Sequence, residues 1–512
     1  MMVTENELRE IENGFIDIID DGISASALAE QIERFKTGFP ATSLERACTL
    51  NDGIYSIQSD EKDELLGHFE EAADGGRFTK FVPASGAATR MFKHLLARLN
   101  GEELSEKDTE MVQTFMDLLP VMPFYGDLQE VMNKAGVSID EAYASNDYNL
   151  ILKYLLTEQG LNYASKPKGL IPFHSYENGY RTPFEEHVAE AAAHIKDRMG
   201  RARLHFTVSP AHEQEIREHI EEAVAKYPEC RFEVTFSKQS RKTDTVAVDM
   251  DNEVFRTDDG KILFRPAGHG ALLDNLHKLR GDLVYLKNID NVMPDRLKGA
   301  TIEYKKLLGG LLVRIQAQIF ECLNMLENHH CSEFEVAAVA IFAVSHLSMQ
   351  MPANFAQMSL EDKVDMLRVR LSKPVRVCGM VKNEGEPGGG PFWVNGPDGF
   401  VTPQIVEKSQ VDMDDSVQAG IVRKATHFNP VDLVCGMRNH RGEWYALKNF
   451  TDPETGFISS KSKDGRKLKA MELPGLWNGS MADWITIFVE VPLSTFSPVK
   501  TVNDLLKEDH RN

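Results

Sequence analysis

The feature that most constrains the fold is a regular alternation of short apolar runs with helical stretches, which starts at about residue 200. The apolar runs are LHFTV at 204–208, RFEVTF at 231–236 and DLVYLKN at 282–288. After the first run, Ser209 is a suitable N-cap, Pro210 is a suitable first helical residue, and apolar residues recur at helical spacing. Strands interleaved with helices predict an α/β fold whose mostly parallel central sheet is covered on both faces and binds ligands at the carboxyl ends of its strands.

Helical segments precede and interrupt this pattern. Residues 1–75 have a helical pattern and open with a capping box, Thr4-x-x-Glu7. Residues 101–165, with Ser105 as N-cap, are expected to form a helical insertion. We therefore expect a helical N-terminal region at 1–75, a main domain at 76–430 that contains the insertion, and a C-terminal region at 431–512.

The composition excludes several classes of protein. Of the 512 residues, 42% are hydrophobic and 26% are charged, which is typical of a globular chain. The formal net charge of -21 disfavours partners such as nucleic acid or an anionic membrane surface. The first residues do not resemble a secretory signal, and the longest apolar run, 336–344, is too short to cross a bilayer and is expected to be a buried helix. Phosphate-bearing ligands must therefore be met by local cations and backbone amides.

The cysteines and histidines do not indicate a metal centre. The six cysteines include no C-x-x-C pair, and reduced thiols in a cytosolic protein are the simplest interpretation. The pairs His329-His330 and His174-His187 are better interpreted as exposed or core histidines than as metal ligands. We therefore expect a cytoplasmic location.

The first motif that can carry chemistry is PASGAATRM at 83–91, after a short apolar run. Small residues let backbone amides approach phosphate oxygens, and the start of a following helix adds a favourable partial charge. Arg90 can neutralise a leaving pyrophosphate. By itself the motif is more typical of a tight turn beside a strand.

Two further loops have compatible features. In KPKG at 166–169, a proline stiffens a loop that presents Lys168, although two loop lysines are usually just solvated. In PAGHGAL at 266–272, Gly268 and Gly270 leave room for a flat base to lie on the backbone. His269, between them, is a positioning residue at best.

Two more motifs supply charged groups. NIDN at 288–291 ends an apolar run, where Asp290 can hold a magnesium ion beside phosphates, and Asn288 is the adjacent polar residue. Alone, this pattern is more often a turn or a helix cap. In FSPVKTVNDLL at 496–506, Lys500 precedes a short helix and can reach a reacting phosphate, although a surface lysine is the default interpretation.

Taken together and in this order, the five segments resemble motifs of the eukaryotic-type UDP-sugar pyrophosphorylases, which include the UDP-glucose and UDP-N-acetylhexosamine enzymes. GAATRM is similar to G-x-G-T-R-[ML], KPKG to P-K-G, PAGHGAL to P-P-G-H-G-D, NIDN to N-x-D-N and FSPVKTVNDLL to F-x-P-V-K-T-x-x-D-L-L. The resemblance extends from about residue 80 to residue 506 and is confined to the motifs. It implies a Rossmann-like nucleotide-diphospho-sugar transferase fold, with a C-terminal part that closes over the sugar.

Two looser similarities and three departures complete the comparison. IVEKS at 405–409 resembles a V-[VI]-E-Y-S run that contacts the sugar, and Phe428-Asn429 resembles an F-N stretch near the sugar or the metal. Ala88 replaces the second glycine of the phosphate loop, Ala271 replaces the acidic residue after G-H-G, and Lys408 replaces the tyrosine. These three departures affect how tightly the loop can bind the phosphates and which sugar the site accepts.

The resemblance implies a nucleotidyltransferase that joins a nucleoside triphosphate, UTP by analogy, to a sugar 1-phosphate and releases pyrophosphate, with Mg²⁺ as cofactor. The main domain, 76–430, is then catalytic, and the region 431–512 contributes the FSPVK segment. Carried over residue by residue, the catalytic cations are Arg90, Lys168 and Lys500, and the metal ligand is Asp290. The nucleotide contacts are Ser85, Gly86, Ala87, Thr89, Gly268, His269 and Gly270, and the sugar contacts are Asn288, Glu407 and Asn429.

Two other functions stay open at this point. Ala88 and Ala271 are compatible with a non-catalytic protein that binds nucleotide sugars. A metal-dependent glycosyltransferase on a related sheet would use Asp290, but it has no triphosphate for Arg90 and Lys500 to grip. In each case the partners are small molecules, without nucleic acid or membrane. The motifs specify neither the base, the sugar nor the oligomeric state.

Overall fold

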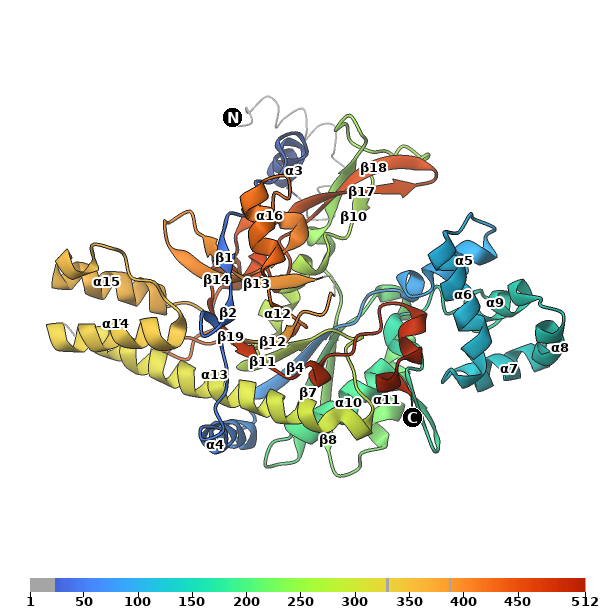
Figure 1. The fold of residues 1–512 in the computed structure, drawn as a ribbon, viewed down its shortest axis with the longest axis horizontal. Helices are drawn as coiled ribbons and strands as arrows, with labels where there is room; N and C mark the ends of the chain where they lie inside the picture. The colour runs from blue at the N-terminus through green and yellow to red at the C-terminus, as the bar shows by residue number, and fades with distance from the viewer. Residues whose placement is uncertain (1–23, 328–330, 386–387, 512) are drawn as a thin grey trace. The chain divides into compact units, whose positions relative to one another are not determined.

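The computed structural model describes residues 24–327, 331–385 and 388–511 (Figure 1). The capping box at Thr4 and the pair His329-His330 therefore lie outside the described residues. The chain divides into two compact units, each built from three separate segments. Unit 1 contains residues 1–69, 239–285 and 307–491, and unit 2 contains residues 70–238, 286–306 and 492–512.

The largest sheet among the described residues has ten strands, and unit 1 contains one part of it. Its core strand β12 (Val375–Lys382) pairs in parallel with β19 (Ile485–Glu490) and antiparallel with β16 (Asp432–Gly436). The side chains of β12 and β16 are buried along nearly the whole strand, as expected for a sheet covered on both faces. On the far side of β19, β3 (Gly53–Tyr55) pairs in parallel with β19 and with the edge strand β2 (Thr49–Leu50). The short strand β15 (His427–Phe428) pairs antiparallel with the end of β12.

Two smaller antiparallel sheets also belong to unit 1. The first contains β1 (Leu44–Ala47), β13 (Gly389–Asn395) and β14 (Val401–Glu407) in that order. The second has the order β10 (Phe264–Arg265), β9 (Thr245–Val248), β18 (Arg466–Glu472) and β17 (Phe457–Lys463). The α-helices that lie in unit 1 are α3 (Ala25–Thr37), α12 (Leu273–Leu279), α14 (Glu333–Leu347), α15 (Leu360–Leu371) and α16 (Ser416–Arg423).

Unit 2 contains a parallel group of strands, β4 (Phe78–Pro83), β7 (Arg201–Thr207) and β8 (Arg231–Ser237). The fully buried strand β11 (Leu283–Lys287) contains the boundary between the units. Strands β7, β8 and β11 coincide with the three apolar runs of the sequence, so the predicted α/β fold with a mostly parallel sheet is confirmed. Unit 2 also contains β5 (His174–Tyr176), β6 (Gly179–Arg181), α5 (Lys93–Leu99), α10 (Pro183–His194) and α11 (Glu213–Ala225). Two helices contain residues of both units, α4 (Lys62–Asp74) and α13 (Lys298–Leu326).

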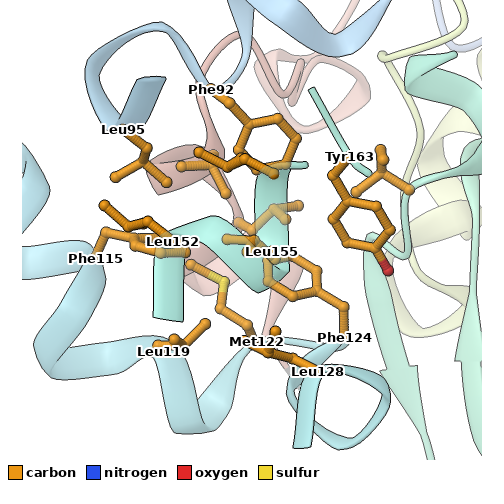
Figure 2. Close-up of a cluster of buried hydrophobic side chains, with 14 of the residues drawn as sticks. Phe92, Leu95, Phe115, Leu119, Met122, Phe124, Leu128, Leu152, Leu155 and Tyr163 are labelled. Atoms are coloured by element: carbon orange, nitrogen blue, oxygen red, sulfur yellow. The ribbon is translucent and has the colours of Figure 1, made fainter. Parts of the chain in front are cut away.

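The helical insertion forms in unit 2 and has its own core. It contains α6 (Glu106–Leu118), α7 (Tyr125–Lys134), α8 (Ile139–Ala144) and α9 (Tyr148–Leu156). Ser105 caps α6, as predicted, because its side chain accepts a hydrogen bond from the Asp108 amide. Figure 2 shows the buried cluster at its centre, in which Phe115, Leu119, Phe124, Leu128, Leu152 and Leu155 pack with Phe92, Leu95 and Tyr163.

Three expectations about elements need correction. The N-terminal region is helical at α3 and α4, but residues 44–55 between them form β1, β2 and β3. The helix expected at Ser209 begins at Glu213, because residues 210–212 form a 3₁₀ turn and Ser209 makes no capping hydrogen bond. The apolar run in α14 is only partly buried, since Ile341 and Val344 are 69% and 50% exposed. None of the described helices is long and apolar enough to be a membrane span.

Candidate active site

The phosphate-loop motif follows β4 in unit 2. The strand is buried, and the Ala84 amide that follows it donates to the Thr207 carbonyl of β7 at 3.0 Å. Beyond this point the loop turns outward, so that Gly86, Ala87, Thr89 and Arg90 are exposed, whereas Ser85 is half-buried. The predicted helix start is weak, because residues 88–90 form only a 3₁₀ turn before the short helix α5. Any anion held here would therefore depend on Arg90 and local amides more than on a helix dipole.

The second motif pairs with the first through its backbone. The Lys168 amide donates to the Gly86 carbonyl at 3.2 Å, and the Ala88 amide donates to the Lys166 carbonyl at 2.9 Å. The Thr89 hydroxyl also donates to the Ala164 carbonyl at 3.0 Å. The two loops therefore form one unit of structure, and the amide of Ala88 is used to hold it together.

Gly169 and Lys168 have separate roles in the second loop. A Cβ at Gly169 would lie 2.5 Å from the Phe184 ring, so only glycine fits there. This close packing presents the neighbouring Lys168, whose Nζ lies 2.6 Å from Oδ2 of Asp290. Both side chains are mostly covered, at 14% and 22% exposure, so their ion pair is less screened than one at the surface.

The NIDN and FSPVKTVNDLL motifs also meet in unit 2. The Val499 amide donates to the Asp290 carbonyl at 3.1 Å, and the Ser497 amide donates to Asn291 Oδ1 at 3.1 Å. Asn288, at the end of β11, is half-buried, and Lys500 is exposed. The Lys500 amide donates to Asp504 Oδ2 at 2.9 Å, which fixes the backbone at the start of a short turn.

The four segments close into a ring of contacts. The phosphate loop and KPKG are joined by the hydrogen bond between the Lys168 amide and the Gly86 carbonyl. KPKG and NIDN are joined by the Lys168–Asp290 ion pair, and NIDN and FSPVKTVNDLL by the Val499 amide. The Val502 amide closes the ring by donating to the Met91 carbonyl at 3.0 Å. Unit 2 thus brings together nine predicted site residues: Ser85, Gly86, Ala87, Thr89, Arg90, Lys168, Asn288, Asp290 and Lys500.

A buried cationic cluster supports the two strands that lead into this ring. The carboxylate of Glu190 in α10 accepts hydrogen bonds from Nζ of Lys80 in β4 at 2.8 Å and from Nζ of Lys287 in β11 at 2.9 Å. Nζ of Lys305 lies 3.4 Å from the same carboxylate. Burial would raise the pKa of Glu190, but the surrounding ammonium groups bring this pKa well below its ordinary value. Burial lowers the pKa of Lys80 to about 7. These charges are fully enclosed by protein.

A second buried network ties the FSPVK segment to the fold. Ser497 Oγ lies 2.9 Å from His510 Nε2, His510 Nδ1 lies 2.8 Å from His174 Nε2, and His174 Nδ1 lies 2.8 Å from Glu186 Oε1. Burial lowers the pKa of His510 to about 3, so this ring is neutral. Each atom is satisfied if the hydroxyl and both Nδ1–H groups donate toward the carboxylate. His174 and His187 are both fully buried, as the interpretation of core histidines predicts.

Sequence reasoning missed both buried networks. Lys80 stands in an otherwise apolar strand, and this was a usable signal, because a lysine there must be exposed or paired. The second network could not be found from the sequence, because its members are up to 336 positions apart and share no motif. It consists of Ser497, His510, His174 and Glu186.

The PAGHGAL motif belongs to unit 1, where glycine is required at two positions. Gly268 has a φ of +73°, and a Cβ there would lie 2.5 Å from Glu472 Oε2. A Cβ at Gly270 would lie 2.0 Å from the Pro474 carbonyl oxygen. His269 stacks on Trp477 with ring centroids 4.1 Å apart, and its Nδ1 accepts the Leu476 amide at 2.9 Å. This geometry agrees with a positioning residue.

The two looser sugar-site similarities also lie in unit 1. Glu407 ends β14 and lines a small cavity together with His269, and burial raises the pKa of its carboxyl group. Asn429 is 4% exposed, and its side chain bonds to backbone atoms: Nδ2 donates to the Gly379 carbonyl at 3.2 Å, and Oδ1 accepts the Val431 amide at 3.0 Å. Asn429 therefore has a structural role that the sequence did not indicate.

The donor set of unit 2 suits a magnesium ion that is completed by substrate. No group of three or more His, Cys, Asp or Glu side chains is arranged to hold a metal ion among the residues that the structure describes. Mg²⁺ commonly binds through one or two carboxylates, with phosphates and waters as the other ligands. Asp290, which pairs with Lys168 and whose carbonyl accepts the Val499 amide next to Lys500, fits this kind of site.

Comparisons with solved structures find the group of enzymes that the motifs resemble. The chain is similar to the UDP-N-acetylglucosamine pyrophosphorylase from Trypanosoma brucei in complex with an inhibitor, at 14% identity and a TM-score of 0.48, over 98% of this chain and 79% of that chain. The chain is also similar to the UDP-glucose pyrophosphorylase from Leishmania major, at 11% identity and a TM-score of 0.44, over 99% of this chain and 82% of that chain. A third similar structure is a putative UDP-N-acetylglucosamine pyrophosphorylase from Entamoeba histolytica, at 11% identity and a TM-score of 0.44, over 89% of this chain and 85% of that chain.

These similarities extend over most of each chain at low sequence identity. Among curated proteins, none matches this chain. One family model covers residues 11–511, which is almost the whole sequence. The chain belongs to the family described as a domain of unknown function (DUF4301).

Proposed function

We propose that this protein is a magnesium-dependent sugar-1-phosphate nucleotidyltransferase of the cytosol, which joins a nucleoside triphosphate, by analogy UTP, to a sugar 1-phosphate. The observation that supports the proposal is the ring of four segments in unit 2, because segments that contact one another carry Arg90, Lys168, Lys500 and Asp290 in a chain whose net charge is -21. In a protein this acidic, a polyanion such as a triphosphate must be bound by local basic residues of this kind.

The chemistry requires alignment and charge neutralisation more than proton transfer. The oxygen of the sugar phosphate is already ionised and attacks the α-phosphorus in line, while pyrophosphate leaves. Arg90, Lys168 and Lys500 would offset the repulsion between the two anions, and the phosphate loop from Ser85 to Thr89 would orient the triphosphate. Asp290 would hold Mg²⁺, which supplies further positive charge to the phosphate oxygens when bound. The reaction needs no covalent nucleophile.

We assign the remaining roles by the motif resemblance. Gly268 and Gly270, with His269 as a positioning residue, would contact the base, while Glu407 and Asn288 would contact the sugar. Asn429 would act by supporting the backbone near Gly389, whose carbonyl accepts the Asn429 amide at 2.8 Å.

The structure also bears on the non-catalytic alternative. Ala88 is 1% exposed and packs in the hydrophobic core shared with the insertion, and Ala271 is 2% exposed. These methyl groups therefore fill space inside the protein instead of projecting from the loops. The two replacements do not by themselves remove a surface for phosphate or base.

Pyrophosphate release is the direct test. The full chain with Mg²⁺ is incubated with UTP or another nucleoside triphosphate and a panel of sugar 1-phosphates, and we expect stoichiometric pyrophosphate and nucleotide sugar from at least one pair. Asp290→Asn should lower kcat by about 10²–10³-fold, the usual effect of removing one preorganised charge contact. Asp140→Asn, at an exposed position of α8, is the matched control. Nucleotide binding without turnover for every pair would support the non-catalytic alternative instead.

A further inference from the structure

Unit 1 contains a small cavity beside the PAGHGAL segment, and every residue that lines it belongs to that unit. Its volume is about 10 Å³, which is room for one particle the size of a water molecule or of a metal ion. Side chains with oxygen atoms make up much of the wall. These residues are Glu407, Gln410, Thr455, Glu472 and Asn478.

Asn478 leaves a buried hydrogen-bond acceptor at this cavity. It is 3% exposed, and its Oδ1 has no hydrogen-bond partner among the described residues. Its Nδ2 donates to Gln410 Oε1 at 3.3 Å and to the carboxylate of Glu407. Both of these groups are acceptors, so the reversed amide would set oxygen against oxygen, and the orientation of the side chain is fixed. A buried acceptor without a partner is costly, which indicates a missing donor or cation.

The charge at the wall of the cavity is negative. Burial raises the pKa of Glu407, the hydrogen bond from Asn478 opposes this, and the nearby Glu472 raises the pKa further. Burial lowers the pKa of His269 to about 4, so its ring brings no positive charge. Lys461 lies 3.9 Å from Glu472, but its side chain is 41% exposed, and solvent screens this contact. A cation inside the cavity would relieve the repulsion between the two carboxylates.

Hydrogen bonds of the wall hold these oxygens in place. The Glu407 carboxylate accepts the Gln410 amide, and the Glu407 amide donates to Gln410 Oε1 at 2.9 Å. Gln410 Nε2 donates to the Thr455 carbonyl at 3.1 Å. Glu472 is the last residue of β18, where it pairs with Phe457 of β17. The oxygens are therefore positioned in advance, which lowers the cost of ordering them around a ligand.

We propose that this cavity binds a divalent cation of the Ca²⁺ kind, held by the carboxylates of Glu407 and Glu472 and by Asn478 Oδ1. Carboxylate and amide oxygens are the ligands that such cations prefer, and two carboxylates balance a double charge. Mg²⁺ usually keeps several waters, for which the cavity has no room, whereas Ca²⁺ takes protein oxygens in their place. A carboxylate has about four lone-pair sites, so Glu407 can hold the ion and still contact a sugar.

Calcium titration of the full chain tests this site. The protein is freed of metal ions with a chelator and titrated with Ca²⁺ alone by calorimetry at neutral pH. We expect binding with a Kd of about 10⁻⁵–10⁻³ M, the weaker part of the range of protein calcium sites, because only two carboxylates contribute. Mg²⁺ should bind at least about tenfold more weakly. Absence of Ca²⁺ binding in this range, or tighter binding of Mg²⁺, would overturn the proposal and leave a cavity for water.

One isosteric variant locates the ion. Glu472→Gln keeps the shape that packs over Gly268 but removes one charge, so the affinity for Ca²⁺ should fall at least about tenfold. Glu361→Gln, at an exposed position of α15, is the matched control and should bind Ca²⁺ as the wild type does. Asp290→Asn, which removes the carboxylate proposed for Mg²⁺ in unit 2, should also keep the affinity. Wild-type affinity in Glu472→Gln would contradict the inference, whatever the pyrophosphate assay shows.

Terbium luminescence gives a second readout that does not depend on a change in the wall. Tb³⁺ replaces Ca²⁺ at oxygen sites, and a nearby tryptophan excites its emission. Trp477 stacks on His269 of the cavity wall, with ring centroids 4.1 Å apart. We expect Tb³⁺ emission that Ca²⁺ displaces, and Trp477→Phe should remove most of the emission while calorimetry still detects Ca²⁺. Unchanged emission in Trp477→Phe would place the ion elsewhere and overturn the proposal.

Discussion

At the scale of single residues, the buried cluster around Glu190 sets the sharpest energetic constraint. Lys80, Lys287 and Glu190 are at most 1% exposed, so the carboxylate stabilises ammonium groups that water does not reach. Removing one partner from a buried ion pair typically costs about 3–5 kcal/mol, because the remaining charge stays desolvated. We expect Glu190→Gln to lower the free energy of unfolding by about this amount in urea denaturation, while Glu222→Gln, exposed on α11, changes it little. Equal effects of the two substitutions would contradict this account.

The pKa of Lys80 gives a second prediction, on pH dependence. Its pKa is about 7 in the fold and has an ordinary value of 10.5, so between these pH values the unfolded chain binds more protons. Stability must then rise with pH across this window, relative to a chain without the group. We expect the wild type to gain stability over Lys80→Met from pH 7 upward, measured by denaturant midpoints. Lys153→Met, exposed on α9, should follow the wild type; parallel curves for wild type and Lys80→Met would show that the pKa is not depressed.

A motif can indicate which residues lie close together, although the roles of those residues toward a ligand stay predictions. Lys168 and Asp290 were expected to serve the same phosphates, and their ion pair of 2.6 Å places them together. Asn429 shows the limit of this reasoning, because an asparagine that caps backbone groups and one that binds a ligand look the same in a sequence. Which of the two applies depends on tertiary neighbours that the motif does not contain.

At the scale of elements, the helical insertion supports two of the site segments. Its hydrophobic core includes Phe92, next to the phosphate loop, and Val499, Val502 and Leu505 of the segment that carries Lys500. The core of the insertion therefore helps to hold the ring of four segments in place, since packed side chains transmit small displacements. This role is consistent with the separation of about 75 residues between Met91, at the end of the first motif, and Lys166, at the start of the second.

Leu505→Ala tests this role. Leu505 is 2% exposed, and truncation of a buried leucine costs about 2–5 kcal/mol. We expect a lower unfolding midpoint and, at a temperature where the variant is folded, a fall in pyrophosphate release, because the Lys500 segment loses its anchor. Leu128→Ala, in α7 of the same core but outside the site segments, should destabilise similarly with a smaller loss of activity per folded molecule. An equal loss of activity in both variants would assign the effect to general destabilisation.

The helices and strands that could be predicted are those whose own residues carry a local pattern, such as an apolar run or a helix cap. Strand β11 is a nearly continuous apolar run, β7 and β8 contain several apolar residues between turn or helix signals, and α6 has a serine cap, so each was evident from the sequence. Strands β1, β2 and β3 have two to four residues and form through partners far along the chain, such as β13 and β19, which a local pattern does not reveal. In α14 the apolar run gave no periodicity, so it could not show that Ile341 is exposed.

At the scale of the whole molecule, each unit is assembled from segments that are distant in sequence. Unit 2 alone combines residues 70–238, 286–306 and 492–512. The predicted regions 1–75, 76–430 and 431–512 follow the order of the chain, because a sequence pattern reveals where composition changes but not which segments pack together.

The buried chain from Ser497 to Glu186 is the clearest consequence of this assembly, and His510 is its central link. We expect His510→Phe to keep the ring volume but leave Ser497 Oγ and His174 Nε2 without their partner, at about 1–3 kcal/mol for each buried group. Because the Ser497 amide holds Asn291 beside Asp290, kcat should fall more than thermal stability alone explains. His510→Gln, which retains a donor and an acceptor, should recover part of the kcat, whereas His212→Phe, a partly exposed position, should behave as wild type. If the Gln and Phe variants lose kcat equally while both remain folded, the hydrogen bonds of His510 do not position the Asp290 segment, and its role is packing alone.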